Sequence, residues 1–97
     1  MTIEYSPEFK KELKNIQIYI SKDNTTASKK FIKDLKKQIE DILNMPYKYR
    51  PSYYHDDELV RDMIYKGYTI IYKIYDEYIK IVEIFNQNLP ILKEQNL

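Results

Sequence analysis

The sequence lacks cysteine altogether and holds one glycine and four prolines among its 97 residues. Without cysteine, the chain has no disulfide, no thiolate metal site and no cysteine nucleophile. The scarcity of glycine and proline excludes a flexible linker, and no apolar run approaches the roughly 20 residues that span a bilayer. We therefore expect a single domain over residues 1–97. Its first residues lack the basic start and apolar stretch of a signal peptide, which indicates a cytoplasmic protein.

A large net charge is missing as well, because 16 Lys and Arg residues face 15 Asp and Glu residues, for a net charge of +1. The charge is nevertheless unevenly spread. Residues 10–37 hold nine lysines against three acidic residues, a local net charge of +6, while residues 38–62 hold three basic and six acidic residues, a local net charge of −3. A basic segment can attract RNA, DNA or an acidic partner, or it can be the solvated side of amphipathic helices. We favour the second interpretation.

Two amphipathic helices are predicted in the first half of the chain. Ser6, Pro7 and Glu8 suit the cap, the first position and the positive end of a helix that begins near Pro7. An apolar stripe follows at helical spacing: Phe9, Leu13, Ile16 and Ile20. After a turn at residues 23–26, a second stripe marks a helix that ends before Pro46: Ala27, Phe31, Leu35, Ile39 and Ile42. The short connection predicts an antiparallel helical hairpin.

The second half of the chain predicts three strands, over residues 59–65, 68–75 and 78–85, joined by the tight connections Lys66-Gly67 and Asp76-Glu77. Residues 2–5 suit a further short strand. The order β-α-α-β-β-β indicates an α+β fold, with the helical hairpin packed on one face of an antiparallel sheet. Alternation along the middle strand separates a core face from an open face. The core face is Tyr68, Ile70, Tyr72 and Ile74, and the open face is Thr69, Ile71, Lys73 and Tyr75.

Several short segments together carry a pattern that belongs to a known superfamily. They are the strand Gly67-Tyr68-Thr69-Ile70-Ile71-Tyr72, the acidic turn Asp76-Glu77, the segment Tyr49-Arg50-Pro51-Ser52-Tyr53, and Arg61 six residues before Gly67. With them, residues 3–86 resemble the RelE/ParE superfamily of bacterial type II toxins, nearer the ParE-like branch. The resemblance implies a growth-inhibiting toxin, of the kind associated with plasmid stabilisation, which a tightly bound cognate antitoxin neutralises.

The superfamily has two main activities, and the chain departs from the pattern of each. RelE-like members cut mRNA in the ribosome, but the basic residues that such nucleases carry are replaced here by Thr69 and Asn86–Leu89. ParE-like members inhibit DNA gyrase and often end the last strand with His or Tyr and an Arg-Asp pair, which is missing here. We expect a toxin that binds an essential target such as DNA gyrase, rather than an enzyme. The alternatives are a ribosome-dependent mRNA endonuclease and a degenerate, non-toxic homologue that binds the antitoxin.

RNA cleavage would require charge stabilisation at the phosphate and groups that move protons. The candidates for catalysis are Arg61, Lys73, Lys80 and His55, the last being the group with an ordinary pKa nearest neutrality. Three carboxylates follow His55 and would repel a phosphate, so we interpret His55 as an exposed loop residue. Consecutive carboxylates in a loop are a poor ligand pattern for a cation. We therefore expect neither a metal nor another cofactor.

An open sheet face with exposed edges is expected to bind protein. We assign antitoxin or target binding to six residues: Arg50, Arg61, Lys66, Ile71, Lys73 and Tyr75. An extended or helical antitoxin segment with acidic side chains would cover them. Neither a membrane partner nor sequence-specific DNA binding by the toxin alone is expected.

Four tyrosines precede the strand predicted over residues 59–65: Tyr47, Tyr49, Tyr53 and Tyr54. They either stack unpaired bases beside Lys48 and Arg50 or, as we favour, cover the end of the sheet. Pro90 blocks a continuing strand in the last residues, 86–97, to which the sequence assigns neither a position nor a role.

Overall fold

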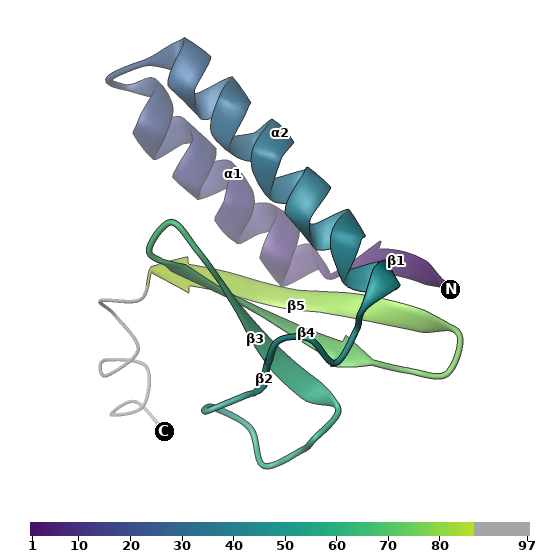
Figure 1. Ribbon diagram of the computed structural model, residues 1–97. Helices are drawn as coiled ribbons and strands as arrows, with labels where there is room; N and C mark the ends of the chain where they lie inside the picture. Colours follow the sequence, from purple (N-terminus) through teal and green to yellow (C-terminus); the bar gives the residue numbers. More distant parts are fainter. Residues whose placement is uncertain (87–97) are drawn as a thin grey trace.

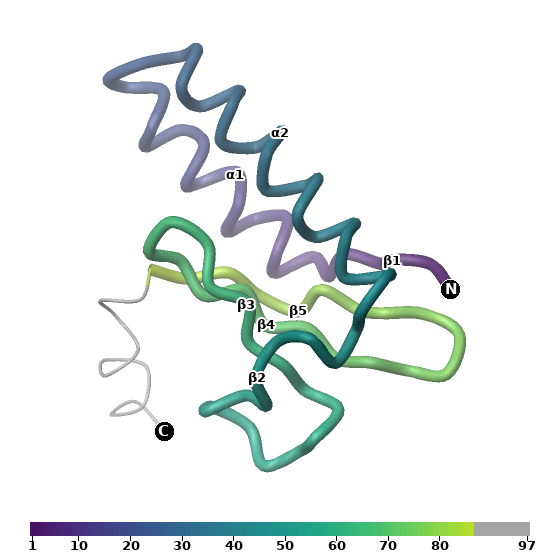
Figure 2. Tube along the Cα trace, viewed as in Figure 1, coloured from purple at the N-terminus to yellow at the C-terminus, as the bar shows by residue number. Residues whose placement is uncertain are grey.

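The computed structural model describes residues 1–86, in which two helices lie against one face of a sheet (Figure 1). The elements are β1 (Thr2–Tyr5), α1 (Pro7–Ser21), α2 (Thr25–Asp41), the 3-10 helix η1 (Ile42–Asn44), β2 (Arg50–Pro51), β3 (Val60–Tyr65), β4 (Tyr68–Ile74) and β5 (Tyr78–Asn86). The α+β class and the predicted order are confirmed, with η1 and the two-residue β2 added. The connected ends of α1 and α2 extend beyond the sheet (Figure 2). Within residues 1–86, no helix is both long and apolar enough to cross a bilayer.

The described strands form one sheet in the order β1-β5-β4-β3-β2. Neighbouring strands from β2 to β5 are antiparallel, as predicted, whereas β1 runs parallel to β5, with Ile3 opposite Ile79. The expectation of a purely antiparallel sheet is therefore wrong at this edge. The pairing joins the two ends of the described chain, and a contact between segments so far apart in sequence leaves no local pattern to predict it.

The first helix begins at the predicted residue, and its cap also ties the helix to the sheet. The Ser6 hydroxyl oxygen accepts a hydrogen bond from the Phe9 N–H (3.0 Å), and the hydroxyl donates to the carbonyl of Val82. Val82 is the extra residue of a β-bulge between β5 and β4. One buried side chain therefore satisfies a backbone donor at the helix start and a backbone acceptor at the bulge.

Replacement of Ser6 by alanine is expected to lower the free energy of unfolding by about 2–3 kcal/mol, because the variant loses a cap and leaves the Val82 carbonyl without its donor. The start of α2 offers a matched control, since the Asn24 side chain accepts from the Ala27 N–H (2.9 Å) at an exposed site. Asn24→Ala should cost about 1 kcal/mol. Urea unfolding of both variants measures the difference. Equal losses would show that the bond to Val82 contributes nothing.

The main core lies between the helices and the side of the sheet that faces them, which we call the helix face. The predicted core side of β4 is confirmed, because Ile70 and Tyr72 are fully buried, Ile74 is nearly so, and Tyr68 packs at the margin. These side chains meet buried residues of both helices: Phe9, Leu13, Phe31, Leu35 and Ile39. The apolar stripes of the helices therefore pack on the sheet, except at Ala27, which is exposed while its neighbour Ser28 is buried.

The opposite side of the sheet, which we call the outer face, carries a second and smaller apolar cluster. Val60, Ile71 and Phe85 are buried there, with Tyr54 and Val82 packed against them. The rings of Tyr54 and Phe85 meet edge to face, with 5.3 Å between their centroids. The expectation that Ile71 is exposed is wrong, because Tyr54 from the loop between β2 and β3 packs over this part of the sheet.

Candidate functional site at the β2 edge of the sheet

The predicted cations Arg50 and Arg61 both lie at the edge of the sheet that β2 forms, on opposite faces of it. β2 pairs with β3 so that Arg50 lies opposite Asp62 and Pro51 lies opposite Arg61. The Ser52 N–H extends the ladder by one bond to the Val60 carbonyl (2.8 Å). Because this ladder has few bonds, it holds β2 only weakly. Side-chain bonds from the two arginines fix the segments on either side of β2.

Arg61 holds the loop around β2 from the helix face. Its Nε and Nη1 donate to the backbone carbonyls of Glu58 (2.9 Å) and Tyr49 (3.0 Å), so one guanidinium joins the two sides of the loop. The Arg61 Cζ also lies 4.9 Å from the centre of the Tyr47 ring, within the range of a cation–π contact. The guanidinium therefore fixes the backbone and supports an aromatic ring at the same time.

Tyr72, which lies opposite Arg61 on β4, fixes the start of the same loop. Its hydroxyl donates to the Pro46 carbonyl (2.7 Å). Burial raises the pKa of this hydroxyl well above its ordinary value, although the nearby Arg61 cation acts in the opposite direction. The hydroxyl therefore stays protonated at physiological pH and serves as a hydrogen-bond donor rather than as an acid or base.

Arg50 holds the segment after β2 on the outer face. Its Nη2 lies 3.4 Å from Oδ2 of Asp62, whose side chain is fully buried, and the same oxygen accepts a bond from the Tyr53 N–H (3.0 Å). The Arg50 Cζ lies 3.8 Å from the centre of the Tyr53 ring. One buried carboxylate thus positions a cation and the aromatic ring that stacks on it.

The four tyrosines of this region divide into two pairs. Tyr49 and Tyr54 pack against the two apolar clusters, as the covering interpretation predicts. Tyr47 and Tyr53 remain 57% and 74% exposed, although each ring rests on a guanidinium. The sequence does not separate the pairs, because all four occur among prolines and charged residues of one loop. We call Tyr47, Arg50, Tyr53 and Arg61 the edge surface.

The other cations predicted for catalysis lie on the outer face. Lys73 and Lys80 are directly opposite each other on β4 and β5. The Lys73 Nζ lies 3.2 Å from Asp57 Oδ2 and 5.3 Å from the centre of the Tyr75 ring. Asp57 Oδ1 accepts a bond from the Leu59 N–H (2.9 Å). Asp57 therefore pairs with Lys73 and orders the end of the loop that leads into β3.

These positions separate the four candidates for catalysis. Arg61 shares the helix face with Tyr72, whereas Lys73 and Lys80 lie on the outer face, because successive residues of a strand point to opposite sides. His55 is exposed in the loop. A phosphate bound to Arg61 would have the sheet between it and both lysines. The arrangement does not place a clamp, a base and an acid around one reacting group.

The remaining predicted binding residues are spread over the molecule. Lys66 lies in the β3–β4 turn, at the far end of β3 from Arg61, with a positive φ of 47° that suits a tight hairpin. Tyr75 stacks on Tyr78, with 4.5 Å between the ring centroids. Of the predicted binding residues, Arg50 and Arg61 alone belong to the edge surface.

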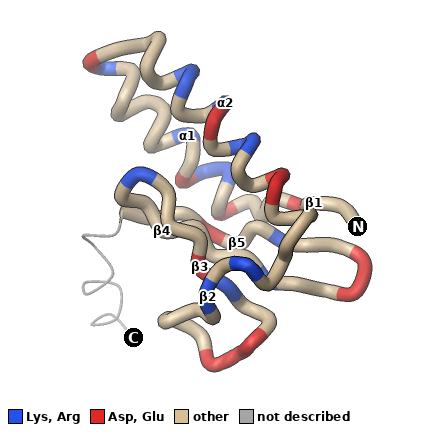
Figure 3. The backbone as a smooth tube through the Cα atoms, viewed as in Figure 1, with Lys and Arg blue, Asp and Glu red and all other residues tan. Residues whose placement is uncertain are grey.

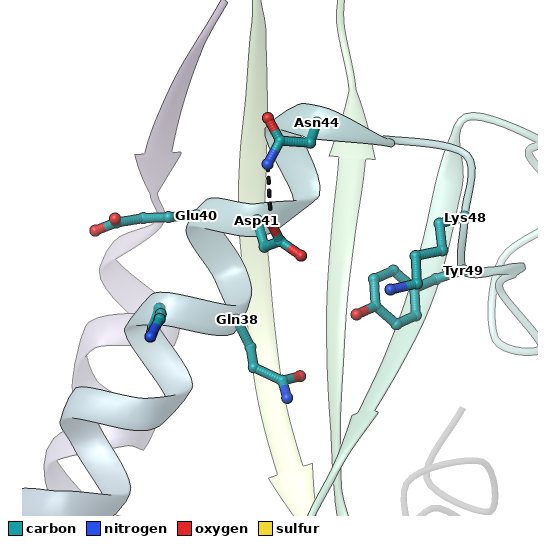
Figure 4. A pocket seen from close by; sticks show the side chains of 7 residues that line it. Gln38, Glu40, Asp41, Asn44, Lys48 and Tyr49 are labelled. Atoms are coloured by element: carbon teal, nitrogen blue, oxygen red, sulfur yellow. Dashed lines mark hydrogen bonds between the residues drawn. The ribbon is translucent and has the colours of Figure 1, made fainter.

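A polar hollow of about 600 Å³ lies next to the loop, between the end of α2 and the residues before β2 (Figure 4). Lys48 and Tyr49 face Gln38 and Asp41 across it, and the Asn44 amide donates to Asp41 (2.8 Å). Cationic and acidic side chains both line the hollow, so it favours neither an anion nor a cation. None of the four candidates for catalysis is among its lining residues.

A family model matches this chain over residues 3–88, and its description is "ParE toxin of type II toxin-antitoxin system, parDE". The chain belongs to the ParE toxin family. The resemblance to RelE/ParE toxins is thereby confirmed, since the match spans almost the whole sequence. No curated protein sequence matches.

Solved structures share the fold of this ParE-family toxin at low sequence identity. A chain of the chromosomal ParDE TA system from P. aeruginosa aligns with a TM-score of 0.74 and 16% identity, over 89% of this chain and 95% of that one. YafQ from E. coli strain BL21(DE3) aligns with a TM-score of 0.61 and 24% identity, over 91% and 94% of the two chains. A chain of the E. coli DinJ-YafQ complex aligns with a TM-score of 0.62 and 22% identity, over 89% of this chain and 92% of that one. At these identities the likeness establishes the fold alone.

Two positions of the toxin bear on RNA cleavage. Thr69, where the resemblance to RelE-like nucleases would place an arginine, is fully buried on the outer face of the sheet. Asn86 ends β5. The rest of the segment in which such nucleases carry a basic residue, and the tail that contains Pro90, lie in residues 87–97, outside the described residues.

The pair of Asp57 and Lys73 predicts how the stability of the toxin changes at low and at high pH. The bond from the Leu59 N–H, and secondly the bond from Lys73, lower the pKa of Asp57 below 3.8, while Asp57 raises the pKa of Lys73 above 10.5. The stabilisation from Asp57 is therefore present above its unfolded pKa and is lost as the pH falls through the lower folded pKa. The stabilisation from Lys73 is present below 10.5 and is lost as the pH rises through the higher folded pKa.

An NMR titration of the Asp57 carboxyl should therefore give a midpoint below 3.8. Lys73→Gln should move this midpoint upward only part of the way, because the larger cause, the Leu59 N–H, remains. Lys66→Gln removes a lysine at the far end of β4 and should leave the midpoint unchanged. A full return to 3.8 in Lys73→Gln would identify the lysine, and not the turn, as the main cause.

Proposed function

We propose that this toxin inhibits an essential protein, such as DNA gyrase, by binding it through the edge surface, and that a cognate antitoxin neutralises the toxin by covering the same region. The observation that carries this proposal is the pair of exposed rings, Tyr47 and Tyr53, each resting on a guanidinium that is bonded to the fold. Binding energy in protein interfaces concentrates on tyrosine and arginine. Rings that are already held in place lose little conformational entropy when a partner binds.

The bonds of the cationic residues also support binding rather than RNA cleavage. Catalysis at a phosphate needs donors aimed at the group on which charge develops. Arg61 donates instead to the carbonyls of Tyr49 and Glu58, and Lys73 pairs with Asp57. These groups hold the loop in place, and their separation by the sheet leaves no single position that all of them can reach.

The antitoxin partner is supported by the family, which belongs to a type II toxin–antitoxin system, and by the ParDE and DinJ-YafQ systems among the similar structures. We propose that the antitoxin segment covers the edge surface and continues to Lys73 and Tyr75 on the outer face. Acidic side chains on that segment would compete with Asp57 for Lys73 and extend to Lys80 beside it. Ile71 lies beneath this surface and supports it from within the second apolar cluster.

The experiment is induction of this chain alone in a bacterium, with growth, mRNA length and the DNA-damage response followed together. Growth arrest with intact mRNA and a damage response is the expected result, and purified chain should then inhibit supercoiling by DNA gyrase. Lys73→Gln should still arrest growth, because Lys73 has no part in the proposed contact with the target. Rapid shortening of mRNA that Lys73→Gln abolishes would replace the proposal with the nuclease. No arrest would leave a homologue that binds only the antitoxin.

A further inference from the structure

Lysines occur along both helices of the hairpin, as Figure 3 shows, and some of them share one side of each helix. Lys10 and Lys14 are one turn apart on α1, and Lys29 and Lys36 are two turns apart on α2, so each pair shares a side of its helix. Lys10, Lys14 and Lys36 line the same groove between the two helices. All four lysines are exposed. We call Lys10, Lys14, Lys29 and Lys36 the lysine face.

Acidic side chains lie mostly elsewhere on the hairpin. Glu12 is on the flank of α1 that faces β5, where its Oε1 accepts a bond from the Ile84 N–H (3.1 Å). Asp34 lies on the other side of α2, two residues before Lys36. Glu40 follows Lys36 by one turn, at the end of the lysine face. Neither of the two ion pairs between described side chains uses a lysine of the hairpin, so its positive charge is not neutralised there.

We propose that the lysine face binds the sugar–phosphate backbone of a nucleic acid without reading its sequence. Lysine is depleted in protein interfaces relative to the rest of the surface, whereas it is a principal contact of nucleic-acid phosphates. Four lysines without an arginine among them present point charges, not the planar forks that read base edges. The exposed ring of α1, Tyr19, lies on the flank near Tyr68 and is not available to stack a base beside these lysines.

The spacing of the lysines suits a phosphate backbone. Lys10 and Lys14 are separated by about 6 Å along the helix axis, at about 1.5 Å per residue. This distance is close to the rise of two base pairs along the axis of a DNA duplex, at about 3.4 Å per base pair. The hairpin also extends beyond the sheet (Figure 1), so a rod-shaped ligand can lie along it while the edge surface, beside β2, is occupied by a protein. The inference thus goes beyond the proposed contact with a protein target.

The test measures binding of the purified full chain to a labelled 20-base-pair duplex of arbitrary sequence, by fluorescence anisotropy between 50 and 200 mM NaCl. Each phosphate contact contributes about −0.9 to the slope of log affinity against log salt concentration. If each of the four lysines neutralises one phosphate, the affinity should therefore fall by about 150-fold over this range. A single-stranded RNA of the same length is the second arm, with a slope of about −0.7 per contact. The tighter of the two identifies the kind of nucleic acid, and absence of salt-dependent binding to both overturns the proposal.

A variant with Lys10→Gln, Lys14→Gln and Lys36→Gln removes three charges from the lysine face. For the duplex, the slope of log affinity against log salt concentration should be less negative by about 2.7 in this variant, which corresponds to the loss of three phosphate contacts. The matched control, Lys30→Gln, Lys37→Gln and Lys66→Gln, removes the same charge, with the two helical positions on the side of α2 that carries Asp34. All six side chains are exposed, so circular dichroism should show both variants folded. Equal losses in the two variants would mean that net charge alone drives binding, and would sink the proposal.

Discussion

A toxin that carries Tyr47→Ala and Tyr53→Ala should fold normally and fail to arrest growth. Both rings are mostly exposed, so little apolar burial is lost with them. Truncation of an interface hot spot costs about 2 kcal/mol or more, which is about 30-fold in affinity for each ring. The two losses do not simply add, because both rings serve one interface. We expect the double variant to bind the target about 100-fold or more weakly, measured as colony survival after induction and as gyrase inhibition.

Two controls show whether the effect belongs to the edge surface. Tyr19 on α1 is 69% exposed, comparable with Tyr53, but lies away from β2. Tyr19→Ala should therefore leave growth arrest intact. Tyr47→Phe and Tyr53→Phe keep the rings on their guanidinium partners and should retain most of the activity. If the double alanine variant remains fully toxic, or if Tyr19→Ala protects cells equally well, the target does not bind at the edge surface.

The elements that the sequence predicted best are those with local causes. The start of α1 depends on Ser6 and Pro7, which act within one turn of the chain. The core side of β4 follows from the alternation of its own residues. The parallel pairing of β1 with β5 and the bulge at Val82 depend on contacts between the two ends of the described chain, so no local pattern marks them.

The sequence predicts the two cations of the edge surface, but it does not predict how they are arranged in space. The chemistry of Arg50 and Arg61 and their place in the resemblance predict a binding role for both, and the structure brings them to one edge. Which rings stay exposed depends on how each guanidinium binds a distant carbonyl or carboxylate. Tyr53 is fixed through Asp62, nine residues away, by a bond that neither periodicity nor composition indicates. Sequence patterns therefore identified the components of the edge surface but not its geometry.

Ile71 shows how a correct strand assignment can still misplace a side chain. The alternation correctly places Ile71 on the outer face, but the prediction that this face is open is wrong at Ile71. Val60 on β3 and Phe85 on β5 are apolar residues on the same face, and together they indicated a second buried cluster. The covering residue, Tyr54, comes from a loop, where pattern arguments are weakest. A face is open only if no loop packs over it, and strand periodicity says nothing about loops.

Ile71→Ala should lower the free energy of unfolding by about 2–4 kcal/mol, because it deletes buried methyl groups and leaves a cavity under Tyr54. Ile71→Asp should prevent stable folding, since a buried and unpaired carboxylate costs several kcal/mol against a total stability of about 5–15 kcal/mol. Urea unfolding followed by circular dichroism measures both variants. This is the largest loss of stability that we expect from a single substitution on the outer face.

Ile64 provides the matched control, because it lies on the same face of the neighbouring strand, opposite Thr69, and is 38% exposed. Ile64→Ala should cost less than about 1 kcal/mol, and Ile64→Asp should fold. The two interpretations of Ile71 then make opposite predictions. An exposed binding residue would tolerate Ile71→Asp in the free toxin and lose only antitoxin affinity, whereas a buried residue loses the fold before any antitoxin is added. A folded Ile71→Asp variant with weakened antitoxin binding would therefore show that Ile71 is a contact and not a support.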